Sequence, residues 1–139
     1  MSTMIRAELS GKNKYWVEKH RYYELKHFCL QYPFWKRAYS EIDGLYGQDF
    51  NPSAYSKSNL PADPTYHLAE KRVRYFHRME MVEQAAINAD PELASYILKG
   101  VTEGASYTYL KSRLEIPCSR DTYYDRYRRF FWLLNKSRD

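Results

Sequence analysis

Arginine and aromatic side chains are mixed in the segment from residue 120 to residue 134. The arginines are Arg120, Arg126, Arg128 and Arg129, and the aromatic residues are Tyr123, Tyr124, Tyr127, Phe130, Phe131 and Trp132. Guanidinium groups donate hydrogen bonds to phosphate oxygens and to guanine edges, whereas aromatic rings favour a protein core. One helix can satisfy both preferences only if the two kinds of side chain lie on different faces.

A helical repeat separates them. Tyr123, Tyr127, Phe130 and Leu134 recur at i, i+4, i+7 and i+11, the spacing of one helix face. Tyr124 and Phe131 widen this stripe, and the arginines fall outside it. The expected packing partners of the stripe are Leu93, Ile97, Leu110, Leu114 and Ile116. We therefore expect the rings to be buried and the arginines to face solvent.

Serine and proline residues predict a turn before this helix. Ser106 is expected to cap a helix of about two turns, YTYLKSRL. Pro117 cannot continue its hydrogen-bond ladder, and Ser119 is expected to cap the longer helix that follows. A short helix, a tight break and a longer basic helix are typical of a helix-turn-helix, here about residues 105–136. A helix over residues 91–99, with Asp90 as its cap and Pro91 as its first residue and closed by Gly100, supplies its third member.

The candidate nucleic-acid-binding side chains lie on the two helices of this unit. They are Ser106, Lys111, Arg113, Ser119, Arg120, Thr122, Tyr124, Arg126, Arg128 and Arg129. Residues near the start of the second helix would contact base edges, and later cations would contact phosphates. Asp125 precedes Arg128 and Arg129 by three and four residues, so surface ion pairs are the alternative explanation for those arginines.

The charge distribution favours an anionic partner. The net charge is +5, and residues 105–139 hold eight Lys and Arg against four Asp and Glu. A basic module of this kind is typical of nucleic-acid binding, although a soluble basic surface has the same composition.

The rest of the chain predicts an all-α fold, because helical spacing dominates and alternating strand patterns are absent. We expect helices over residues 15–30 and from Pro33 to near Gly44, and a long helix that starts at Asp63-Pro64 with Leu68, Val73, Phe76, Met79, Val82 and Ala86 on its apolar face. Residues 44–63 are rich in Gly, Pro, Ser and Asn, which indicates a flexible linker or loop. The expected organisation is an N-terminal helical segment (1–43), this linker (44–63), and a helical domain carrying the helix-turn-helix (64–139).

Other chemistries find little support. Cys29 and Cys118 are far apart in sequence, which favours a reducing, cytoplasmic location. The spacing of the four histidines and of Cys29 matches no zinc pattern, and no phosphate loop or nucleophile signature is present. We expect no enzyme, no metal, no cofactor and no membrane span.

The run from Glu103 to Phe130 resembles the region-four helix-turn-helix of sigma factors, in Glu103-Gly104, Ser106-Tyr107, Leu110, Ile116 and Thr122. It is more similar to the RinA/ArpU-type regulators of bacteriophages, in which the recognition helix also ends in a basic-aromatic stretch like YYDRYRRFFWLL. The resemblance covers about 35 residues, and the chain departs from typical sigma factors in the Pro117-Cys118 pair of the turn.

This resemblance implies a sequence-specific DNA-binding transcriptional regulator of bacteriophage or prophage type, acting in the bacterial cytoplasm. Its expected partners are double-stranded DNA, RNA polymerase or another host nucleic-acid-processing protein, and a second copy of the chain. Candidates for the homodimer contact are Tyr23, Phe28, Phe34 and Trp35, which could also serve an internal core. The alternative function is a phage-encoded inhibitor that binds a host nucleic-acid-processing protein, in the manner of an anti-CRISPR or a polymerase-binding protein.

Overall fold

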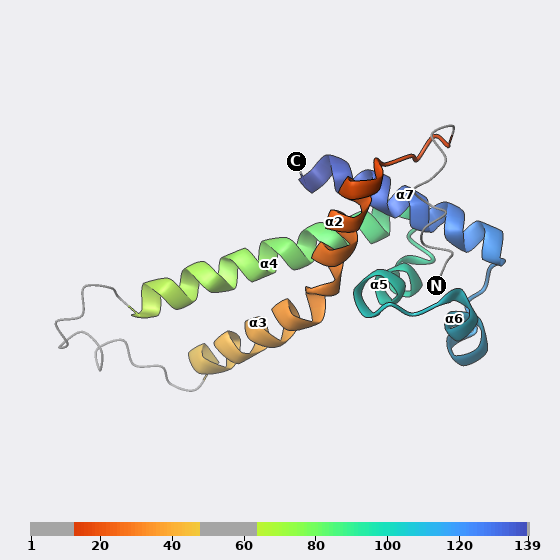
Figure 1. Cartoon of the computed structure of the whole chain (residues 1–139). Coiled ribbons are helices and arrows are strands. Elements are labelled where there is room, and N and C mark those ends of the chain that lie inside the picture. Colours follow the sequence, from red (N-terminus) through yellow and green to blue (C-terminus); the bar gives the residue numbers. More distant parts are fainter. Residues whose placement is uncertain (1–12, 48–63, 139) are drawn as a thin grey trace.

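The computed structural model describes residues 13–47 and 64–138, and within these ranges the regular structure is entirely helical (Figure 1). The helices are α2 (Lys19–Leu30), α3 (Tyr32–Gly47), α4 (Pro64–Ala89), α5 (Ala94–Glu103), α6 (Tyr107–Leu114) and α7 (Arg120–Arg138). The predicted all-α class is confirmed. The predicted linker lies outside the described residues except for its first four positions.

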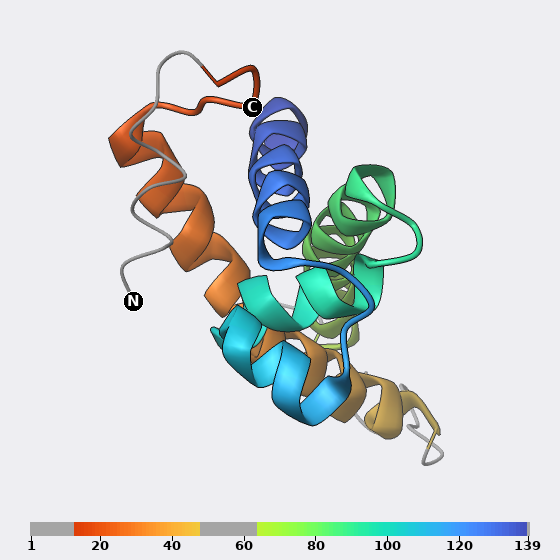
Figure 2. The ribbon, with the colours of Figure 1, turned by 90° about the vertical axis from the view of Figure 1, so that its right-hand side faces the viewer.

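Helix α4 packs against three other helices, α3, α5 and α7. Its N-terminal part runs beside α3, and its C-terminal part packs against α5 and α7. Figure 2 shows α7 between α2 and α4, with α5 and α6 lying across the start of α7. Helix α7, which carries the arginines and aromatic residues, is therefore a central element of the bundle and not an appendage on its surface.

One hydrophobic core joins these helices. Its largest fully buried side chains are Trp35, Tyr22, Tyr123, Phe130, Phe131, Leu25, Ile97, Leu110, Ile116, Leu134, Val82 and Cys29. They come from every helix from α2 to α7 and from the turn after α6. The helices on both sides of the predicted linker therefore stabilise each other by burying apolar surface in common.

The first described helix starts later than predicted. Glu18 has an extended backbone, and its carboxylate accepts hydrogen bonds from the backbone N–H groups of His20 and Arg21. This cap satisfies donors at the start of α2 and leaves residues 15–17 outside the helix. Tyr15 and Val17 are nevertheless buried, whereas Trp16 is exposed.

Helix α3 continues beyond the predicted stop. It begins at Tyr32 and passes through Gly44 to Gly47. A glycine inside a helix costs about 1 kcal/mol relative to alanine, which packing of α3 along α4 can offset.

Both ends predicted for α5 were wrong. The Asp90 carboxylate accepts hydrogen bonds from the backbone N–H groups of Glu92 and Leu93, but this cap holds a turn over residues 91–93, and α5 begins only at Ala94. At the other end, Gly100 lies within the helix. Gly104 ends it with a φ of 74°, the left-handed conformation that suits glycine at a helix end.

Several predicted core positions face solvent instead. Val73 and Phe76 on α4 are 50% and 44% exposed, and Leu114 at the end of α6 is 36% exposed. Helix α4 needs only one buried face, and Met79, Val82, Ala85, Ala86 and Ala89 provide it.

Phe28 and Trp35, which were candidates for a dimer contact, are buried in the core, while Phe34 is exposed. No helix in the described ranges is long and apolar enough to cross a membrane.

Candidate nucleic-acid interface

Helix α6 starts and stops at residues with defined caps. Ser106 has an extended backbone, and its hydroxyl accepts a hydrogen bond from the backbone N–H of Tyr109 at 3.1 Å. Glu115 ends the helix in the left-handed conformation, with a φ of 54°. The backbone N–H of Ile116 then donates to the Leu110 carbonyl, and the Ile116 side chain turns into the core. The predicted cap at Ser106 and the predicted break after Leu114 are both confirmed.

The turn between α6 and α7 is held by side-chain hydrogen bonds. The Tyr107 hydroxyl donates to the Cys118 carbonyl oxygen at 2.6 Å, which ties the turn to the first residue of α6. The Ser119 hydroxyl accepts from the backbone N–H of Thr122 at 3.2 Å, as expected for the cap of α7. The two helices therefore have a fixed relative position at this corner of the molecule.

The buried face of α7 carries the stripe of residues that the helical repeat predicts. Tyr123, Tyr127, Phe130, Phe131 and Leu134 are at most 2% exposed. Burial raises the pKa of Tyr127 well above its ordinary value, and its hydroxyl lies 3.2 Å from that of Tyr22. The expectation that the rings of this helix form the core is confirmed.

Two of the four arginines bind acceptors that lie outside the helix-turn-helix unit. The Arg126 Nε donates to the Asp90 carboxylate at 3.0 Å, and its Nη1 pairs with Asp125. These carboxylates, Asp90 first, raise the pKa of Arg126 above its ordinary value. Arg126 therefore clamps the junction between α4 and α5 onto α7.

Arg129 has a similar role on the next turn. It donates to the Tyr15 hydroxyl at 3.1 Å and to the Asn88 carbonyl at 3.4 Å. The hydrogen bond from Arg129 lowers the pKa of Tyr15. The expectation that all four arginines face solvent freely is wrong for Arg126 and Arg129, because acceptors distant in sequence lie within reach.

The remaining predicted residues divide by exposure. Thr122, Tyr124 and Arg128 are half-buried, and Tyr124 packs edge-on against Tyr123 with ring centroids 5.0 Å apart. Ser106, Lys111, Arg113, Ser119 and Arg120 are exposed. The exposed members therefore gather on α6 and at the first residues of α7, while most of α7 is covered.

Arg120 connects these two helices. Its Nη2 lies 3.3 Å from the Thr108 hydroxyl, to which it donates, and its guanidinium carbon lies 5.1 Å from the centroid of the Tyr107 ring. This packing holds the charge of Arg120 beside α6 while the side chain stays exposed.

We call the exposed polar surface of α6 and the start of α7 the α6 surface. It consists of the cations Lys111, Arg113 and Arg120 and the hydroxyl residues Ser106, Thr108, Ser112 and Ser119. Thr108 and Ser112 were not predicted, although their i, i+4 spacing beside Lys111 is a helical pattern that the sequence contains. The cations of the α6 surface and the hydroxyl groups of Ser106 and Thr108 can donate hydrogen bonds to phosphate oxygens. The hydroxyl groups of Ser112 and Ser119 already donate to the Thr108 carbonyl and the Thr122 hydroxyl. The exposed carboxylates of Glu115 and Asp121 border this surface.

In the described part of the chain, no three His, Cys, Asp or Glu side chains lie close enough together to hold a metal ion.

Comparisons with known proteins found no protein-family model, no curated protein and no solved structure that matches the chain.

Proposed function

We propose that this protein binds double-stranded DNA through the α6 surface and acts as a transcriptional regulator of bacteriophage type. The observation that supports the proposal is the grouping of Lys111, Arg113 and Arg120 with four hydroxyl side chains at one corner of a basic bundle. Cations and hydroxyl groups are the side chains that most often contact the DNA backbone.

In this proposal the arginines of α7 have two roles. Arg120, at the exposed start of the helix, contacts the duplex, and the positive end of the helix dipole favours a phosphate there. Arg126 and Arg129 stabilise the fold that presents the α6 surface. Because three cations give modest affinity, tight binding requires two copies of the module on neighbouring half-sites, and we propose a homodimer for this reason.

The test compares two matched pairs of substitutions. The double variant Lys111→Gln/Arg113→Gln removes two charges from the α6 surface, and Lys36→Gln/Arg37→Gln removes two exposed charges from α3. Binding to duplex DNA is measured by fluorescence anisotropy over a range of salt concentrations. We expect the first variant to weaken binding by at least about tenfold and to reduce the salt slope by about two, and the second to bind like the wild type. Equal losses in both variants would contradict the proposal.

A second candidate function rests on a different observation. Phe34, Val73 and Phe76 are exposed apolar side chains on α3 and α4, which favours a protein contact. An inhibitor of a host nucleic-acid-processing protein would use such a surface. This candidate replaces the first if the protein binds no duplex in a salt-sensitive way but captures a host protein that the Phe76→Ser variant releases.

A further inference from the structure

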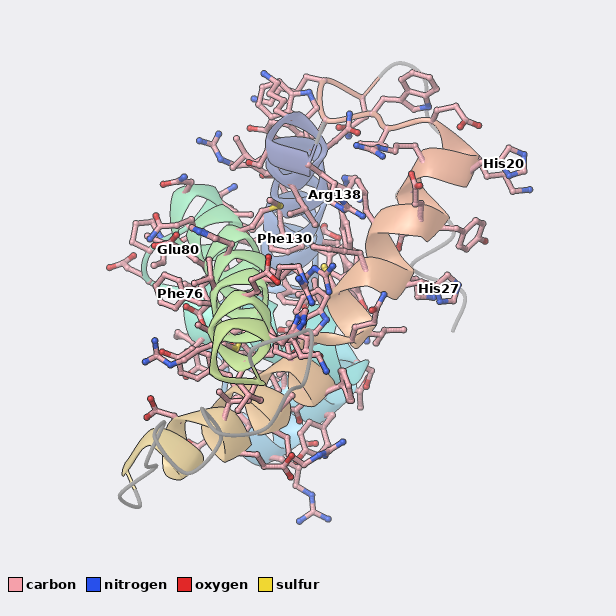
Figure 3. All side chains as sticks on the ribbon, turned by 90° about the vertical axis from the view of Figure 1, so that its left-hand side faces the viewer. His20, His27, Phe76, Glu80, Phe130 and Arg138 are labelled. Carbon is pink, nitrogen blue, oxygen red and sulfur yellow. The ribbon has the colours of Figure 1, made fainter. Side chains whose placement is uncertain are left out.

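A hollow of about 390 Å³ lies where α2, α3, α4 and the end of α7 meet. Its lining residues are Phe28, Gln31, Trp35, Arg74, His77, Arg78, Met81 and Arg138. Figure 3 shows the molecule from this side, with Arg138 between α2 and α4. Its volume is within the usual range of small-molecule sites, about 300–1,000 Å³.

Two of its arginines are positioned by buried rings. The Arg138 guanidinium carbon lies 4.1 Å from the centroid of the Phe28 ring, and that of Arg78 lies 5.8 Å from the centroid of Trp35. The two rings pack against each other, with centroids 4.8 Å apart. Phe28 and Trp35 are almost fully buried, so they form a rigid floor that holds a guanidinium group over each ring.

The third arginine shares a helix face with Arg78. Arg74, Arg78 and Met81 are spaced i, i+4 and i+7 on α4, which directs all three into the hollow. Like charges at i and i+4 repel each other. The arrangement is therefore unfavourable for the empty protein and favourable once an anion lies between the guanidinium groups.

No carboxylate of the described residues neutralises these arginines. Among the described residues, Arg74, Arg78 and Arg138 form no ion pair with a carboxylate, and no Asp or Glu lines the hollow. Glu80 is 4.0 Å from the Nδ1 atom of His77, but it lies on the side of α4 turned away from Arg138 (Figure 3). Arg126 and Arg129 contrast with these three, since both have acceptors within the protein.

We propose that this hollow is a binding site for a compact anion with two or more phosphoryl groups, such as pyrophosphate or the polyphosphate of a nucleotide. Guanidinium groups match phosphate oxygens in pairs of hydrogen bonds, and the Gln31 amide adds a further donor. The hollow is open to solvent, since Gln31, Arg74, His77 and Arg138 are exposed, and a hollow of this volume suits a compact ligand better than a duplex. The site is independent of the α6 surface, because the two lie at opposite ends of α7, about 27 Å apart along a helix of this length.

The main test is isothermal titration calorimetry of the full chain with inorganic pyrophosphate, ATP and a short single-stranded oligonucleotide. Arg74→Gln is the principal variant because Arg74 does not rest on a core ring, and Arg138→Gln is the second. Arg74→Lys keeps the charge but loses the paired hydrogen bonds. Arg113→Gln removes a charge from the α6 surface and is the matched control.

We expect pyrophosphate or ATP to bind the wild type one to one, and binding by Arg74→Gln and Arg138→Gln to weaken by about tenfold or more. Arg74→Lys should lose less, and Arg113→Gln should bind like the wild type. Stronger pyrophosphate binding than ATP binding identifies the phosphoryl groups alone as the ligand, and the reverse identifies a nucleotide. The proposal is overturned by no binding at millimolar concentration, by equal affinity of wild type and Arg74→Gln, by an equal loss in Arg113→Gln, or by binding of the oligonucleotide alone.

Discussion

The Tyr123 hydroxyl lies where the Cβ of any larger residue at position 100 would be placed. Gly100 is inside α5, Tyr123 is on the buried face of α7, and the missing side chain allows the two helices to approach. The glycine is therefore required by packing and not by the end of a helix.

Gly100→Ala should destabilise the protein by about 1–3 kcal/mol, because the clash outweighs the roughly 1 kcal/mol that alanine gains in helix propensity. Gly44→Ala is the control, since Gly44 is also helical but has no heavy atom within 4 Å of the added Cβ. It should leave the protein as stable or stabilise it by up to about 1 kcal/mol. Chemical denaturation measures both, and a neutral Gly100→Ala would contradict this interpretation.

The double variant Gly100→Ala/Tyr123→Phe should recover most of the lost stability. The Tyr123 hydroxyl is buried and has no hydrogen-bond partner, so Tyr123→Phe removes the clash without breaking a hydrogen bond. A double-mutant cycle measures the coupling, and additive effects would exclude the proposed clash.

Arg126→Gln should lower stability by about 1 kcal/mol, because it removes the ion pair with Asp90. The loss is modest since this pair is partly exposed and water screens its charges. Asp90→Ala should cost about 1 kcal/mol more, since the Asp90 carboxylate also caps the turn after α4. DNA affinity of the folded Arg126→Gln protein should match that of the wild type. An affinity loss as large as that of Arg113→Gln would instead place Arg126 in the DNA contact.

Asp121→Asn should raise DNA affinity while slightly lowering stability. The exposed Asp121 carboxylate in the first turn of α7 favours the helix dipole but repels phosphate at the α6 surface. We expect about a fivefold gain in affinity at low salt that shrinks as salt is added. Glu41→Gln, on the exposed surface of α3, is the control and should change neither property. Unchanged affinity in Asp121→Asn would count against the position of the interface.

Stability should fall as the pH rises above 10, the ordinary pKa of tyrosine. Burial raises the pKa of Tyr32, Tyr123 and Tyr127 in the folded protein, and Glu83 raises that of Tyr32 further. The unfolded chain therefore releases these protons first. The stability that neutral tyrosines contribute is complete below pH 10 and is lost above it, by at most about 1.4 kcal/mol per pH unit for each residue.

Urea denaturation between pH 8 and 11 tests this dependence, with phenolate absorbance as a second signal. In Tyr123→Phe, the free energy of unfolding should fall less steeply with pH, because one of the three buried tyrosines is removed. Tyr15 has the opposite sign, because its lowered pKa contributes stability that is present above pH 10 and lost as the pH falls through its folded value. A stability that stays constant up to pH 11 would show that the three phenols are not buried.

Local features were predictable from the sequence. The all-α class, the caps at Ser106 and Ser119, and the buried stripe of α7 depend on residues within a few positions of each other. A cap needs a hydroxyl at one position and a free N–H two or three residues later. A buried face needs only the helical repeat.

Tertiary structure alone decided which cations are free. Arg126 and Arg129 bind acceptors at Asp90, Asn88 and Tyr15, which a helical repeat cannot relate to α7. The hollow that gathers Arg74, Arg78 and Arg138 likewise depends on the meeting of four elements. The sequence places an arginine on a helix face, but whether its charge is neutralised depends on carboxylates and carbonyls that only the packing of distant segments brings within hydrogen-bonding distance.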